Sequence, residues 1–109
     1  MTDATLLAQV LDSFTDPLLV ADTEHTVVYV NNAAADHYTG GDSLMGTSLL
    51  DCHNEHPQEV MIEVLATLQS GEEERLISDD EKRRIYTRAV RDEAGDVVRY
   101  YERYEWKAA

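Results

Sequence analysis

Two stretches of the chain carry apolar residues at the spacing of an amphipathic helix. Residues 4–14 form the first stripe, and Pro17 ends the helix that it predicts, because a residue before proline avoids the α conformation. Residues 56–70 form the second stripe and predict a longer helix, with Pro57 in its first turn and a glycine cap after its last turn. The two stripes consist of Leu6, Leu7, Val10, Leu11 and Phe14, and of Val60, Met61, Val64, Leu65 and Leu68.

Five other stretches have the alternation or the β-branched composition of strands. Residues 18–21 and 26–30 flank a polar turn and predict a hairpin. Three more strands are expected at 73–78, 83–91 and 97–106, with acidic turns between them. One face of the last strand carries more charge, so we expect that face to point outward and the other to point into the core. The inner face holds Val98, Tyr100, Glu102, Tyr104 and Trp106.

A short helix is expected between the hairpin and the long helix. It spans residues 33–38, follows two asparagines that suit a helix cap, and ends at a pair of glycines. Residues 42–53 are broken by Gly46 and predict single turns. The resulting order is helix, two strands, helices and three strands. It predicts an α+β domain, with five antiparallel strands and the helices segregated to one face.

Composition narrows the classes of protein that this fold can serve. The 109 residues suffice for one domain with a modest core, and 43% of them are hydrophobic, which argues against disorder. Asp and Glu number 22 against 9 Lys and Arg, giving a net charge of −13 that disfavours nucleic acid and anionic membranes. An acidic chain with few lysines also suits a salty cytoplasm. No apolar run approaches a membrane span, no secretion leader is visible, and Cys52 is a lone cysteine. We therefore expect a cytoplasmic protein.

Four short segments, in their order along the chain, resemble the PAS family of sensor domains. They are the first-strand phrase at 16–22, the strand and asparagines at 26–32, the loop Leu44-Met45-Gly46-Thr47-Ser48-Leu49-Leu50, and the last turn at 91–96. The likeness runs from about Leu11 to Trp106. It implies a PAS fold at 16–106, preceded by a flanking helix at 1–15 and followed by a tail at 107–109.

Two departures from the family pattern concern the last strand. Many relatives have a glycine where Arg99 and Tyr101 stand here. Many also end this strand in Asp-Ile-Thr, which leads to the output domain, whereas this chain reads Tyr104-Glu105-Trp106-Lys107. The resemblance therefore leaves open how a signal leaves the domain.

The resemblance implies a sensory module in a larger signal-transduction protein, joined to an output domain and forming a homodimer. A small ligand or cofactor would lie between the long helix and the sheet. Two alternatives stay open, a domain with no ligand that serves protein–protein contact, and a core that is simply packed. The stripe at 4–14 likewise either packs on its own domain or pairs with a second subunit. The side chains placed at the pocket are Val60, Met61, Val64, Leu65, Ile85, Thr87, Ala89, Tyr100, Glu102 and Tyr104.

One cluster suggests a particular cofactor. His53 and His56 precede the long helix, at the mouth of such a pocket, and neutral imidazole ligates haem iron. Some chemoreceptor PAS domains bind haem b through a histidine in this region and reach the bound gas with a tryptophan of a Glu-Trp pair, which Glu105-Trp106 resembles. That likeness implies haem b with His53 as first candidate axial ligand, His56 as second and Trp106 as distal partner. Histidine at a helix start and tryptophan at a strand end also occur for packing alone.

An enzymatic function has little support in the sequence. The chain has no phosphate-binding glycine loop, no Gly-x-Ser-x-Gly turn and no paired cysteines for zinc. No nucleophile stands beside a base, and carboxylates are abundant without forming a recognisable pair. We expect a binding module and no catalytic residues.

Overall fold

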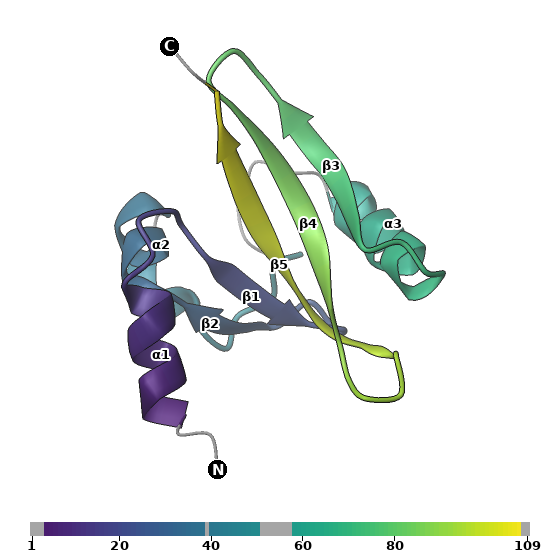
Figure 1. Ribbon diagram of the computed structural model, residues 1–109, viewed down its shortest axis with the longest axis horizontal. Helices are drawn as coiled ribbons and strands as arrows, with labels where there is room; N and C mark the ends of the chain where they lie inside the picture. Colours follow the sequence, from purple (N-terminus) through teal and green to yellow (C-terminus); the bar gives the residue numbers. More distant parts are fainter. Residues whose placement is uncertain (1–3, 39, 51–57, 108–109) are drawn as a thin grey trace.

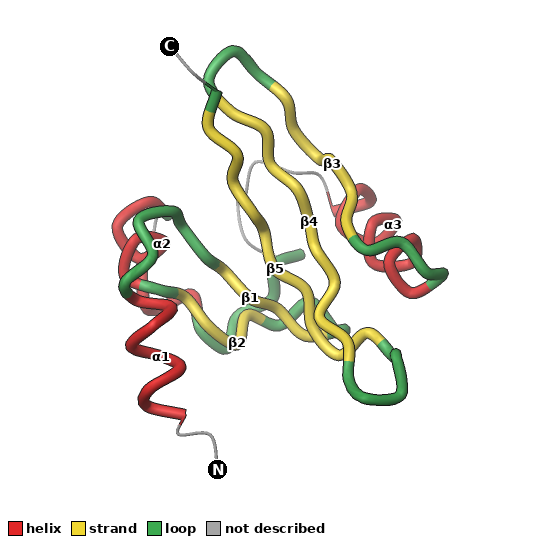
Figure 2. Tube along the Cα trace, in the orientation of Figure 1, coloured by secondary structure: helices red, strands yellow, loops and turns green. Residues whose placement is uncertain are grey.

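The computed structural model describes residues 4–38, 40–50 and 58–107, which form one five-stranded sheet with helices around it (Figures 1 and 2). The helices are α1 (Ala4–Asp12), α2 (Asn32–His37), the 3-10 turn η1 (Gly41–Leu44) and α3 (Gln58–Gln69). The strands are β1 (Leu19–Asp22), β2 (Val27–Val30), β3 (Glu74–Asp79), β4 (Arg83–Arg91) and β5 (Val97–Trp106).

The sheet is antiparallel throughout, with the order β2-β1-β5-β4-β3. The first strand therefore pairs with the last, and the two longest strands, β4 and β5, form the middle of the sheet. This confirms the expected α+β architecture, and β4 and β5 have the bounds that alternation predicts. The expected helix at 4–14 is shorter, because the Ser13 hydroxyl donates to the Val10 carbonyl at 2.6 Å and closes the last turn after Asp12.

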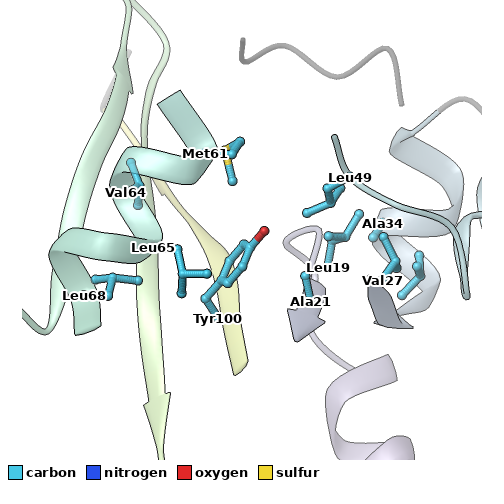
Figure 3. Packing of buried hydrophobic residues seen from close by; sticks show 11 residues of the cluster. Leu19, Ala21, Val27, Ala34, Leu49, Met61, Val64, Leu65, Leu68 and Tyr100 are labelled. Atoms are coloured by element: carbon cyan, nitrogen blue, oxygen red, sulfur yellow. The ribbon is translucent and has the colours of Figure 1, made fainter. Parts of the chain in front are cut away.

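One face of the sheet carries the hydrophobic core. Leu19 and Ala21 of β1 and Tyr100 of β5 are buried there against Met61 and Leu65 of α3. Figure 3 shows Tyr100 between the α3 side chains and those of the hairpin. The helix α3 uses its predicted stripe for this contact, since its buried residues are Met61, Val64, Leu65 and Leu68.

The opposite face of the sheet is a ladder of ion pairs. Glu74 of β3 accepts hydrogen bonds from Arg88 of β4 at 3.1 Å and from Arg103 of β5 at 3.0 Å. The Arg103 guanidinium also lies 4.3 Å from the centre of the Tyr86 ring. The bond from Arg103 is the main reason why the pKa of Glu74 is lowered. The charged face of β5 thus points outward, as its sequence indicates.

Asn31 holds the start of the fold together through one fully buried side chain. Its Oδ1 accepts from the backbone N–H of Ala34 at 2.8 Å, which caps α2, and from that of Leu18 at 2.9 Å. Its Nδ2 donates to the carbonyls of Leu11 at 3.0 Å and Asp16 at 3.2 Å. A single amide therefore connects the end of α1, the entry to β1 and the start of α2.

We expect Asn31→Ala to lower the free energy of unfolding by about 3 kcal/mol, because it leaves several buried backbone groups without partners. Urea unfolding followed by circular dichroism measures the change. The matched control is Asn32→Ala at the exposed neighbouring position, which should stay within about 0.5 kcal/mol of the parent chain. Equal effects of the two substitutions would show that Asn31 has no such role.

Candidate functional site

A row of polar side chains crosses the buried face of the sheet. In β5 the inward-facing residues are Tyr100, Glu102 and Tyr104, all buried. In β4, Thr87 pairs directly with Glu102, so both side chains lie on the same face. Glu102 is 7% exposed and Thr87 is 0% exposed. Such groups are costly to bury unless they have partners, so their partners define the chemistry of this region.

Glu102 and Tyr104 are joined through Tyr38, the residue that caps the C-terminal end of α2. The Tyr38 hydroxyl donates to Glu102 Oε2 at 3.0 Å and lies 2.6 Å from the Tyr104 hydroxyl. Since a phenol has one hydrogen and that of Tyr38 goes to Glu102, Tyr104 is the donor to Tyr38. His37 Nε2 lies 3.5 Å from the Tyr104 oxygen at the far end of this chain. The C-terminal end of α2 is thereby fixed to the middle of β5.

Burial raises the pKa of Tyr38 well above that of an ordinary tyrosine, and the negative charge of Glu102 raises the pKa further. Burial raises the pKa of Tyr100 as well, with smaller contributions from Glu102 and Asp22. Both phenols therefore stay protonated at physiological pH. Tyr38 remains a hydrogen-bond donor to a carboxylate in a site of low polarity, where such a bond is strong.

Thr87 differs from its neighbours because its hydroxyl has no partner. Among the residues that the structure describes, its Oγ1 is the only fully buried side-chain oxygen or nitrogen without a hydrogen bond. The side chain lies between Ile85 and Ala89 on the inner face of β4 and opposite Glu102. A buried hydroxyl without a partner destabilises the folded state by roughly 1–3 kcal/mol. Such a cost in an otherwise satisfied core marks the position as a site candidate.

A second buried pair ties the hairpin turn to β5. His25 Nδ1 lies 2.6 Å from the Tyr100 hydroxyl, and the His25 side chain is buried. The residue has a φ of 66°, in the left-handed region, where it closes the turn after Asp22. Burial lowers the pKa of His25, although the nearby charge of Asp22 opposes the shift. The imidazole is therefore held neutral within the core.

Two of the apolar residues expected at the pocket, Ile85 and Ala89, flank Thr87 on β4, and those of α3 pack in one core cluster with Tyr100. Ile85, Met61, Val64 and Leu65 are buried, and Val60 and Ala89 are partly buried against the same core. All ten side chains assigned to the pocket therefore lie at or beside one face of the sheet. The structure also adds Tyr38 and His25, which the sequence analysis does not select. Neither stands in a pattern that would identify it, since each reaches β5 only through the tertiary fold.

The residues proposed for haem are distributed differently. His53 and His56 lie outside the described residues. Trp106, at the end of β5, is 51% exposed, stacks on Tyr104 with ring centres 5.9 Å apart, and donates its indole N–H to Asp16 Oδ1 at 2.6 Å. Within the described part of the chain, no group of three or more His, Cys, Asp or Glu side chains is arranged to hold a metal ion. In that same part, no helix has both the length and the apolar character that a membrane span requires.

Comparison with known proteins identifies the family. A family model described as the PAS fold matches residues 11–105, so the chain belongs to the PAS family. PAS domains are sensory modules, typically found within larger signalling proteins such as sensor histidine kinases. No curated protein matches the chain.

Solved structures agree on the fold at low sequence identity. A sensory box sensor histidine kinase from Vibrio cholerae is 16% identical, with a TM-score of 0.70 over 96% of this chain and 92% of that chain. A C-terminal domain from Streptococcus mutans is 18% identical, with a TM-score of 0.73 over 96% of this chain and 85% of that one. The PAS domain of an HTR-like protein from Haloarcula marismortui is 17% identical, with a TM-score of 0.60 over 95% and 91%.

His25 should make the stability of the domain depend on pH. Its pKa is lower in the folded state than the 6.5 of an unfolded chain, so the unfolded state binds the proton more readily. The free energy of unfolding should therefore fall as the pH drops below about 6.5. In His25→Asn, which tolerates the left-handed turn, this component should disappear, and stability near pH 7.5 should fall by about 1 kcal/mol.

The measurement is urea unfolding of both chains between about pH 7.5 and 5.5, a range that lies above the lowered pKa of Glu74. Taking the difference between the two chains cancels contributions from the other histidines. Parallel pH curves for the two chains would show that His25 does not titrate in this way.

Proposed function

We propose that this domain is a sensory input module that holds a small ligand against the inner face of its sheet and passes the signal to an output domain of a larger protein. The observation that carries this proposal is the unpartnered hydroxyl of Thr87 beside the buried carboxylate of Glu102. The family membership supports the sensory role. The apolar side chains of α3 and a few polar anchors on the sheet match the usual composition of a small-molecule site.

The route by which occupancy would be signalled runs along β5. Glu102 and Tyr104 belong to the polar row, and Tyr104 stacks on Trp106 at the end of the same strand. Trp106 in turn donates its indole N–H to Asp16, in the segment between α1 and β1. A ligand that favours one arrangement of Tyr104 would thus bias the contact between the two ends of the domain.

Thr87→Val tests the proposal, because it replaces the hydroxyl with a methyl group of similar shape. In the empty domain we expect the free energy of unfolding to rise by about 1 kcal/mol, since the buried hydroxyl gains nothing there. Ligand held by the parent chain should be reduced or lost in the variant. Denaturing both purified proteins and analysing the released small molecules by mass spectrometry measures the second effect.

The control is Thr67→Val, which removes a hydroxyl that does have a partner, the Glu63 carbonyl at 3.0 Å. This change should leave any bound molecule in place and should not raise stability. A drop in stability for Thr87→Val, together with no released molecule from the parent chain, would contradict the proposal. The purified parent chain also tests the haem b alternative. That alternative requires a Soret band after haemin is added, and the band must be absent in His53→Ala.

A second candidate function is dimerisation without a ligand, and the exposure of α1 favours it. None of the residues of α1 is buried in the described chain. Four large apolar side chains in and just after this helix are each about half exposed: Leu6 53%, Leu7 50%, Val10 47% and Phe14 51%. Packing on its own domain, one of the two interpretations of this stripe, covers only about half of these side chains. Pairing with a second copy would remove it from water.

We expect Leu6→Glu combined with Val10→Glu to convert a dimer to a monomer, because it places two charges in the apolar stripe. Sedimentation velocity at about 50 μM, a concentration at which a micromolar dimer is mostly assembled, measures the effect. Gln9→Glu, a charge added at another exposed position of α1, serves as the control and should leave the dimer intact. A dimer that persists in the double variant would exclude the helix as its interface.

A further inference from the structure

We infer that the ligand is a small organic cation, an ammonium or amidinium group on a short apolar body, which donates its N–H groups to the Glu102 carboxylate and to Thr87 Oγ1. This inference rests on the proposed function and names the class of ligand for the same site. It follows from the donors and acceptors that the buried polar row presents.

Thr87 and Glu102 present hydrogen-bond acceptors to each other's side of the buried face. A carboxylate has only acceptor positions, and the Thr87 hydroxyl accepts as well as donates. The two side chains are opposite one another on β4 and β5, at 0% and 7% exposure. A group placed between them therefore meets oxygen atoms and negative charge. Bonds from an ionised N–H to a carboxylate are about twice as strong as bonds between neutral groups.

The hydroxyl hydrogens of Tyr38 and Tyr104 are used in bonds within the protein. The Tyr38 hydrogen goes to Glu102, and the Tyr104 hydrogen goes to the Tyr38 oxygen. These two phenols can then offer a ligand only their oxygen lone pairs. Among the described residues of the row, the Thr87 hydroxyl is the one group that could donate to a ligand anion or carbonyl, whereas a ligand rich in N–H groups would meet the oxygens of Thr87, Glu102 and the phenols.

Charge and packing limit the ligand further. The net charge of −13 makes the surrounding potential negative, which concentrates cations and repels anions at any entrance to the site. The buried residues nearby are apolar: Ile85 lies next to Thr87 on the inner face of β4, and Met61 and Leu65 of α3 pack in one cluster with Tyr100. A short aliphatic body suits such surroundings, so the ligand combines one cationic end with one apolar end.

The experiment compares three probes of equal length at neutral pH: n-butylammonium, butan-1-ol and butyrate. Shifts of backbone amide signals in nuclear magnetic resonance spectra give the affinity and locate the site. We expect n-butylammonium to bind with a Kd of about 1–10 mM, a range suited to so small a molecule, and to shift signals in β4 and β5. Butan-1-ol should bind at least about tenfold more weakly, and butyrate should not bind.

Two variants with the same change of net charge separate a local effect from a general one. Glu102→Gln should weaken n-butylammonium binding by about tenfold or more, while Glu105→Gln, on the outer ladder beside Arg84, should leave it unchanged. Thr87→Val, in which Glu102 is intact, should weaken n-butylammonium binding several-fold. Equal losses in the two glutamine variants would overturn the inference, because binding would then follow net charge alone.

The relative affinities of the three probes also test the class of ligand. If butan-1-ol or butyrate binds as tightly as n-butylammonium or more tightly, the cation class is wrong while the ligand site stands. If no probe binds, the cation class is likewise wrong. The proposed function is judged separately, by the stability change and the released molecules in the Thr87→Val experiment.

Discussion

The arrangement of this domain depends on the buried side-chain amide of Asn31. Its four hydrogen bonds connect the last turn of α1 to the entry into β1 and to the start of α2. Since β1 pairs with both β2 and β5, an error in its position would displace the strand that carries the polar row. The direction of α2 also determines whether Tyr38 reaches Glu102. A local capping interaction thus positions a contact between distant segments.

The inner face of the sheet combines two requirements that oppose each other. The α3 side chains supply apolar area, which stabilises the fold by about 25 cal/mol for each Å² removed from water. The polar row on β5 and β4 reduces this stabilisation, because its polar groups are removed from water. Within the described chain, the hydroxyl of Thr87 has no hydrogen bond that would offset its burial. Proteins retain such local costs mainly at positions that serve a function. On the outer face, by contrast, Glu74 is paired with the guanidinium groups of Arg88 and Arg103.

Much of the fold could be predicted from the sequence, because its strands alternate clearly and its helices have caps and breakers. The bounds of β4 and β5 follow from alternation alone, and Glu102 stands out as the one charged residue on an otherwise apolar face. The partners of the site could not be predicted in this way. Tyr38 lies 64 residues from Glu102 and His25 lies 75 residues from Tyr100, and neither pair shares a local pattern. The pairing of β1 with β5 and the direction of α2 bring them together.

Trp106 gives the domain a built-in optical reporter. It is the single tryptophan of the chain, and its indole is half exposed, bonded to the Asp16 carboxylate and stacked on Tyr104. Indole emission responds to the charge and solvent next to the ring. Loss or movement of the Asp16 contact would therefore change the colour and intensity of the fluorescence. The junction between the two ends of the domain can be followed in unlabelled protein, in real time, while the interior of the domain is perturbed.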